Sequence, residues 1–110
     1  PVLSQARMMV LSYPHNPTTA IAPLSFFQQA VAFCQQHDLV LVHDFPYVDL
    51  VFSSEASSEE NYQLPITNYQ SIAPSILQAD PDKSVSIEFF TLSKSYNMGG
   101  FRIGYAIGNA

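Results

Sequence analysis

Apolar residues along the chain fall into short runs and one helical stripe, a pattern that predicts strands alternating with helices. A first apolar run, residues 8–11, lies within residues 7–13 and leads into a Pro-His-Asn-Pro turn, which is typical of a buried strand. Residues 23–37 predict a helix, because apolar positions recur there every three or four residues and Pro23 suits the first helical position. The apolar positions of this stripe are Leu24, Phe27, Val31 and Cys34.

The rest of the chain predicts three further strands. Residues 39–42 follow the helix closely and are all aliphatic, residues 85–92 form a longer apolar stretch, and residues 103–107 form a last one. The polar residues 53–69 are expected to form an exposed loop, and residues 71–79 a short helix. This order of elements predicts an α/β fold: a mostly parallel sheet with flanking helices.

Polar residues follow each of the first three predicted strands. Asn16 comes after the first strand, Asp44 after the second and Lys94 after the third. Because ligands of open parallel sheets collect at the carboxyl ends of the strands, we expect these three side chains to meet at one edge of the sheet.

Composition restricts the classes of protein and partner. A chain of 110 residues, with 47% hydrophobic and 12% charged residues, is expected to form one folded domain. Its net charge of -5, with only 4 Lys and Arg residues, offers no basic surface to nucleic acid or to an anionic membrane. No apolar run approaches the roughly 20 residues that a membrane span needs. We therefore expect no nucleic-acid partner and no membrane association.

The single cysteine, Cys34, cannot form an internal disulfide, which suits a reducing compartment and predicts a cytoplasmic protein. Cys34 and His37 share a helix face, and His43 and Asp44 follow, so these residues could be interpreted as a zinc site. A structural explanation is favoured, because Cys34 belongs to the apolar stripe and His37 suits the negative end of the helix dipole. We therefore expect no structural metal.

The residues around Lys94 indicate a functional site, but they are compatible with more than one role for its amine. On pattern alone its amine could be a surface charge, a phosphate binder or the amine of a Schiff base. The hydroxyls of Thr91 and Ser93 and the guanidinium of Arg102 are near in sequence and could together hold an anionic group. The other lysine, Lys83, lies in an Asp-Pro-Asp-Lys segment that is expected to be solvated.

Three segments together resemble a known family. They read YPHNPT at residues 13–18, HDFPYVDL at residues 43–50 and TLSKSYNMGGFRIG at residues 91–104. In this order they resemble the Asn-Pro turn, the Asp-x-x-Tyr element and the lysine motif of class I/II, fold-type I aminotransferases, which use pyridoxal 5'-phosphate. The amino-acid sequence of residues 87–98 is most similar to that of the branch that contains LL-diaminopimelate and alanine aminotransferases.

The resemblance implies a role for four of the candidate residues. Lys94 would form the Schiff base with the cofactor and act as general acid and base. Asp44 would pair with the pyridine nitrogen and keep it protonated, so that the ring withdraws electrons. Tyr47 and Asn16 would hydrogen-bond the phenolic oxygen of the ring.

The resemblance also implies a site for the cofactor phosphate. Arg102 and Thr91 would hold this group, with assistance from Ser93, and the planar guanidinium of Arg102 offers a fork that lysine cannot reproduce. The family often has serine where this chain has Thr91, and the hydroxyl survives that departure.

Each candidate also has an ordinary structural explanation. Asn16 beside a proline is typical of turns, and Asp44 before Phe-Pro could simply end a strand. Tyr47 could be a half-buried aromatic residue and Arg102 a surface charge. The occurrence of three motifs in the family's order favours the functional interpretation.

The resemblance leads us to interpret residues 1–110 as part of the cofactor-binding large domain of a longer, homodimeric aminotransferase. The parent protein would transfer an amino group between an amino acid and a 2-oxo acid in amino-acid metabolism and biosynthesis. The chain alone is expected to be inactive. It lacks the family's N-terminal phosphate-binding turn, the aromatic residue that stacks on the cofactor and the C-terminal arginine that binds the substrate carboxylate.

Three alternatives stay open at this point. A carbon-sulfur lyase or related pyridoxal-phosphate enzyme of the same fold would share all three motifs. A non-catalytic relative could bind the cofactor as a regulatory domain attached to a DNA-binding domain. The segment could also fold, or associate through sheet edges, without binding the cofactor.

Overall fold

The computed structural model describes residues 3–51 and 73–109, so the loop expected at residues 53–69 lies outside the described residues. The helix and all four strands that the sequence predicts are present. None of the helices in these two ranges is long and apolar enough to cross a membrane. With η for a short 3-10 turn, the elements are η1 (Leu3–Gln5), β1 (Met8–Ser12), α1 (Leu24–His37), β2 (Val40–Asp44), η3 (Ile76–Gln78), β3 (Ser86–Thr91), η4 (Gly99–Phe101) and β4 (Gly104–Gly108).

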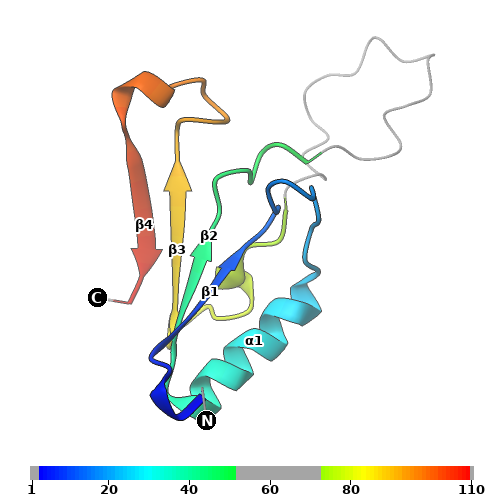
Figure 1. Cartoon of the computed structure of the whole chain (residues 1–110), viewed down its shortest axis with the longest axis vertical. Coiled ribbons are helices and arrows are strands. Elements are labelled where there is room, and N and C mark those ends of the chain that lie inside the picture. The colour runs from blue at the N-terminus through cyan, green and yellow to red at the C-terminus, as the bar shows by residue number, and fades with distance from the viewer. Residues whose placement is uncertain (1–2, 52–72, 110) are drawn as a thin grey trace, which may run out of the picture.

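The strands form one sheet in the order β1-β2-β3-β4 (Figure 1). β1 pairs with β2 and β2 with β3 in parallel, whereas β4 pairs with β3 antiparallel. The connection through α1 is long enough for parallel pairing, and the short connection after β3 brings the chain directly back. The predicted α/β fold with a mostly parallel sheet is confirmed, with one antiparallel strand at its edge.

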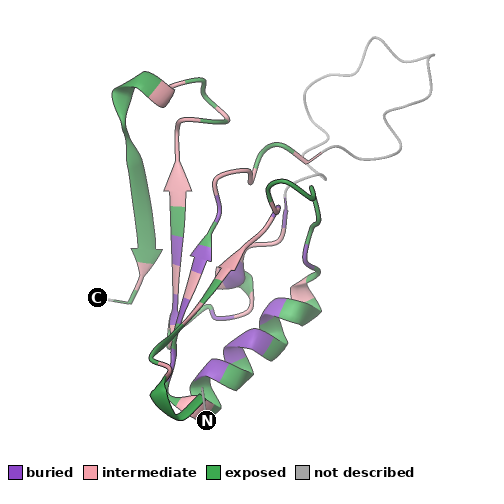
Figure 2. Ribbon diagram, viewed as in Figure 1, coloured by how far each residue is buried: buried purple, intermediate pink, exposed green. Residues whose placement is uncertain are grey.

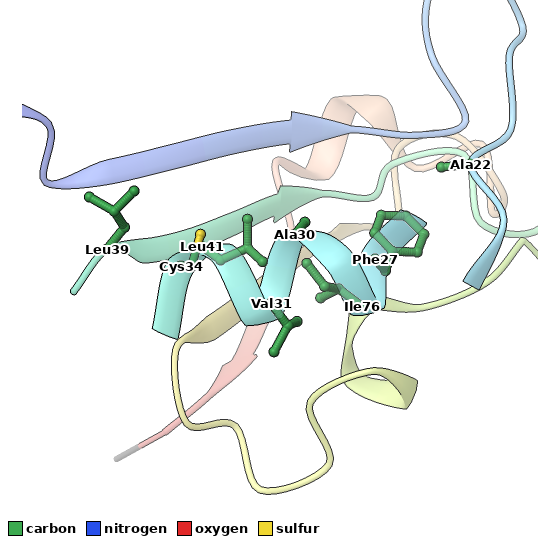
Figure 3. Close-up of a cluster of buried hydrophobic side chains, with 8 residues drawn as sticks. All are labelled: Ala22, Phe27, Ala30, Val31, Cys34, Leu39, Leu41 and Ile76. Atoms are coloured by element: carbon green, nitrogen blue, oxygen red, sulfur yellow. The ribbon is translucent and has the colours of Figure 1, made fainter. Parts of the chain in front are cut away.

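α1 covers one face of the sheet and buries the stripe that its periodicity predicts (Figures 2 and 3). Phe27 and Cys34 are fully buried in a cluster with Leu41 from β2 and Ile76 from η3. Burying a large apolar side chain in this way contributes about 1.5–3 kcal/mol. The helix ends at Asp38, which adopts a left-handed conformation (φ 54°) and donates its N–H to the Cys34 carbonyl.

The second strand extends beyond the aliphatic residues 39–42 that predict it, and ends at Asp44. Its side chains alternate between the two faces of the sheet. Leu41 and His43 are buried on the face that α1 covers, whereas Asp44 is exposed on the other. His43 and Asp44, the polar residues that follow the apolar run, therefore belong to β2.

The face of the sheet opposite α1 carries several exposed apolar side chains. Met8, Val10 and Val40 are 56%, 58% and 50% exposed there, and Phe89 is 43% exposed. In the part of the chain that the structure describes, α1 is the one α-helix, and it packs on the other face.

The short helix expected at residues 71–79 is, in its described part, the single 3-10 turn η3. The Ser75 hydroxyl caps this turn by accepting the N–H of Leu77. The turn does not continue beyond Ala79, because the Asp80 carboxylate binds the backbone N–H groups of residues 84–86 and the chain turns there toward β3. The end of this segment is therefore hydrogen-bonded to the start of β3 and does not extend as a helix.

Candidate functional site

The carboxyl ends of the three parallel strands lie at one edge of the sheet and carry the predicted polar residues. Asp44 is the last residue of β2, where it pairs with Ser12 of β1 and Phe89 of β3. Asn16 lies in the turn that follows β1, and Lys94 lies in the turn that follows β3. The structure thus places all three at the edge that the sequence predicts.

Tyr47 brings two of these residues together. The Asn16 amide nitrogen Nδ2 donates a hydrogen bond of 3.0 Å to the Tyr47 phenolic oxygen. The ammonium nitrogen of Lys94 lies 5.7 Å from the centre of the Tyr47 ring, within the range of a cation–π contact. Residues from the turns after β1, β2 and β3 therefore meet around one aromatic ring.

The charges of Asp44 and Lys94 are not paired with each other. Asp44 is exposed at the end of β2, and no side chain in the described part of the chain forms a hydrogen bond or ion pair with its carboxylate. Lys94 is also exposed, and its contact with the Tyr47 ring leaves the three N–H donors of its ammonium free of protein acceptors among the described residues. One edge therefore presents an acid and an amine that are both available to a ligand.

The predicted phosphate residues lie where β3 ends. The Thr91 hydroxyl donates to the Ser93 hydroxyl at 2.9 Å, and the Ser93 N–H donates to the Thr91 oxygen at 3.1 Å. The guanidinium of Arg102 is exposed, and its Nη1 donates to the Gly99 carbonyl at 3.1 Å. The structure brings the two hydroxyls together, but it shows no contact between them and Arg102.

β3, the turn after it and β4 form a hairpin that carries both the predicted lysine and the predicted arginine. The N–H of Leu92 donates to the carbonyl of Ile103 at 3.2 Å and continues the pairing beyond the strands. A Cβ on Gly104 would lie 2.6 Å from the Phe90 carbonyl oxygen, so this close approach requires glycine.

A hollow of about 620 Å³ opens beside Asn16 and Tyr47. The rest of its wall includes the apolar side chains of Ile21, Leu50 and Val51. The other predicted site residues do not line it. These residues are Asp44, Thr91, Ser93, Lys94 and Arg102.

The structure also contains a buried polar pair that the sequence motifs do not single out. His43 Nδ1 lies 2.7 Å from Glu88 Oε1, and both side chains are 0% exposed. The sequence does hold a signal for the pair. Each residue occupies a strand position that faces the covered side of the sheet, where an ionisable group needs a partner.

The zinc interpretation of Cys34, His37, His43 and Asp44 does not fit the geometry. Cys34 belongs to the apolar core, and burial raises the pKa of its thiol, which disfavours the thiolate that binds zinc. Both ring nitrogens of His43 are engaged, by Glu88 and by the Tyr13 carbonyl oxygen. Among residues 3–51 and 73–109, no group of three His, Cys, Asp or Glu side chains could hold a metal ion.

Comparison with known proteins places the chain in a family. The family model of aminotransferases of class I and II matches residues 2–110. LL-diaminopimelate aminotransferase 2 of Trichormus variabilis is 44% identical over 109 residues, which are 99% of this chain and 24% of that protein. Glutamate-pyruvate aminotransferase AlaC of Escherichia coli is 41% identical over 103 residues, 94% of this chain and 21% of that protein.

The fold is similar to solved structures as well. An aminotransferase from Staphylococcus aureus matches with a TM-score of 0.77 and 35% identity, over 98% of this chain and 24% of that one. The chain therefore spans about a quarter of the length of the relatives that it matches.

Proposed function

Because the chain belongs to the family of class I and II aminotransferases, we propose that it is part of the large domain of a pyridoxal-phosphate-dependent aminotransferase. Members of this family use pyridoxal phosphate. The full-length protein would transfer an amino group between an amino acid and a 2-oxo acid. Since residues 1–110 span about a quarter of the relatives' length, the remaining parts of the site would come from the rest of the protein.

The observation that carries the proposal is the meeting of Lys94, Tyr47 and Asn16 at the edge where Asp44 has no ion-pair partner among the described residues. Pyridoxal phosphate has an aldehyde, a phenolic oxygen, a ring nitrogen and a phosphate. The edge offers an amine for the first, a phenol and an amide for the second, and a carboxylate for the third. Chemically, the donor set fits the cofactor.

When bound, the cofactor supplies an electron-withdrawing ring to an amino acid attached to it. Lys94 would bind the aldehyde carbon through its amine and, once released, hold and move a proton at Nζ. Asp44 would keep the ring nitrogen protonated, because an adjacent carboxylate favours the cationic form. Tyr47 and Asn16 would orient the ring by hydrogen bonds to its phenolic oxygen.

The hairpin residues would hold the phosphate. The adjacent hydroxyls of Thr91 and Ser93 can donate to phosphate oxygens, and the exposed guanidinium of Arg102 can bind two of them at once. In the structure, Arg102 binds the Gly99 carbonyl, so its guanidinium would exchange that hydrogen bond for the phosphate.

The finer assignments rest on the family resemblance. We propose a cytoplasmic biosynthetic enzyme that is a homodimer, with an amino acid and a 2-oxo acid as its substrates. The relatives reported above are all named aminotransferases, which favours amino-group transfer over the carbon-sulfur lyase and the regulatory domain.

The proposal is tested by titrating the full-length protein with pyridoxal phosphate, trapping the bound cofactor with borohydride and mapping the labelled peptide. The label is expected on Lys94. A Lys83→Arg variant is the matched control, because Lys83 lies in the turn before β3 and donates to the Pro81 carbonyl. A label on Lys83, or no label at all, would refute the assignment.

The class of reaction has its own measurement. After incubation with an amino acid and a 2-oxo acid, amino-group transfer yields a new 2-oxo acid and a new amino acid. Release of ammonia and a thiol from a sulfur-containing amino acid would instead establish a lyase.

A further inference from the structure

We propose that the buried pair His43–Glu88 is a positioning device that holds the turn carrying Asn16 in a fixed relation to Asp44. The proposal rests on the proposed function for its catalytic meaning, because it assigns both of these residues to the cofactor. Its structural content is independent of the cofactor. Neither His43 nor Glu88 would touch the ligand, and both would act through the backbone segments that they connect.

The first step of the argument is the bonding of the imidazole. His43 Nδ1 lies 2.7 Å from Glu88 Oε1, and Nε2 lies 3.0 Å from the backbone carbonyl oxygen of Tyr13. A carbonyl oxygen only accepts, and so does a carboxylate. Two acceptors on one ring are satisfied when both nitrogens carry a proton, so the contacts favour an imidazolium paired with a carboxylate.

The second step is that Glu88 is itself held. Its Oε1 accepts the N–H of Ile76 at 3.0 Å, and its Oε2 accepts the hydroxyl of Ser75 at 2.6 Å. The carboxylate is thus fixed from η3 as well as from β3. The His43 ring also packs between Phe27 and Phe45, with ring centres 4.8 Å and 4.6 Å away.

The third step concerns what the ring connects. The β1–β2 pairing ends at the pair Ser12 and Asp44, and the chain then continues from Tyr13 into the turn that contains Asn16. The hydrogen bond from His43 to the Tyr13 carbonyl therefore links the two segments at the point where the strand pairing ends. Since His43 directly precedes Asp44, one ring ties the turn of β1 to the end of β2.

The energetics favour positioning over simple stabilisation. A buried ion pair typically contributes little net stability compared with apolar residues of similar size, because both charges lose their hydration. Such a pair does fix geometry, since either partner left alone would be a buried charge. Directional bonds at this place would keep Asn16 and Asp44 at the separation that one cofactor ring requires.

The test compares Glu88→Gln with Asp80→Asn in the full-length protein. Both substitutions replace a buried carboxylate by its amide. Asp80 precedes the amino end of β3, whereas the proposed site lies at the carboxyl ends of the strands. Hydrogen exchange of the cofactor-free protein reports on the turn, where the N–H groups of His15 and Thr19 are bonded within residues 15–20. Glu88→Gln is expected to speed exchange of these two amides about tenfold or more, whereas Asp80→Asn is expected to leave these two amides near wild type and to accelerate exchange near residues 84–86.

Cofactor binding gives the second readout. Glu88→Gln is expected to weaken pyridoxal phosphate binding by about 10–100-fold and to shift the pH midpoint of the bound cofactor's absorption band, with Asp80→Asn within about twofold of wild type. The milder Ser75→Ala, which removes one bond to Glu88, is expected to change both readouts in the same direction and serves if Glu88→Gln does not fold.

The outcomes separate the two proposals. Unchanged exchange of the turn in Ser75→Ala and in any folded Glu88→Gln protein would overturn the positioning role, whatever the cofactor does. A wild-type protein that does not bind pyridoxal phosphate would refute the proposed function, while the exchange experiment would still judge the pair.

Discussion

The polar residues near the two ends of β3 differ in how many hydrogen bonds their side chains form. Before its amino end, Asp80 is 3% exposed and its carboxylate accepts five hydrogen bonds from residues 84–86. Beyond its carboxyl end, Lys94 is exposed, and so is Asp44 on the neighbouring strand; within residues 3–51 and 73–109, neither forms an ion pair. Polar groups are satisfied where they only maintain the fold, and they are left available where a ligand is expected.

The titration of Asp80 reflects its surroundings. Burial raises the pKa of this carboxyl, but hydrogen bonds from the Ser86 side chain, the N–H groups of Val85 and Ser84, and the Ser84 hydroxyl outweigh burial and hold the pKa well below its usual range. The carboxylate is thus bound as an anion, and its bonds belong to the folded state.

The largest effect on activity is expected from a substitution of Lys94, beyond the carboxyl end of β3. Lys94→Ala in the full-length protein should lower kcat by about 10²–10⁴-fold or more, because it removes the group proposed to move the proton. The melting temperature should stay near that of wild type, since the side chain is exposed and contributes only a cation–π contact with Tyr47 within the described part of the chain. A steady-state assay paired with thermal unfolding checks both. Activity close to wild type would break the comparison between the two ends.

Asp80→Asn should show the reverse pattern. An amide cannot accept all five hydrogen bonds, so groups that the carboxylate satisfied lose their partner, at a cost of about 1–3 kcal/mol each. Denaturant unfolding of the full-length protein should reveal a less stable large domain, while the affinity for pyridoxal phosphate stays the same. A variant that unfolds like wild type but binds the cofactor poorly would contradict the structural role.

The stability of the folded protein at acid pH should also depend on the Asp80 carboxylate. A folded-state pKa below the unfolded value of about 3.9 means that Asp80 contributes stability above that pH and that the contribution is lost as pH falls below it. Unfolding measured from pH 6 down to about pH 3 should therefore show a shallower loss of stability in Asp80→Asn than in wild type. Parallel pH profiles for the two proteins would be evidence against this linkage.

Tyr47→Phe should have the smallest effect. It removes the oxygen that accepts the Asn16 amide but keeps the ring beside Lys94, so stability should change by about 0.5–1.5 kcal/mol. The pH midpoint of the bound cofactor's absorption should shift more clearly, because the proposed donor to the phenolic oxygen is gone. An unchanged spectrum would place the Tyr47 hydroxyl outside the cofactor site.

The helix and the strands could be predicted because their signals are local. The stripe through Phe27 and Cys34 marks a buried face directly in the sequence, and the short apolar runs mark the strands, although β1 and β4 bury none of their residues. The edge that carries Asn16, Asp44 and Lys94 follows from the same reasoning, since parallel strands bring their carboxyl ends together.

The features that escaped prediction depend on contacts between distant residues. The buried polar residue His43 is satisfied by Glu88 from the neighbouring strand, a contact that the sequence motifs do not single out. The short helix expected at residues 71–79 is limited, in its described part, to the 3-10 turn η3 for a similar reason. Ser75 and the N–H of Ile76 are bound by Glu88, which holds the turn against the sheet.

The antiparallel return of β4 gives the hairpin a further consequence. Because Gly104 keeps β4 tight against β3, the amine of Lys94 and the guanidinium of Arg102 project from a single closed segment of backbone. An anion that binds Arg102 therefore also restricts the motion of the backbone that carries the amine. The conformational entropy of that segment would then be lost once for both groups, when the anion binds, and the amine of Lys94 would be ordered by the same event.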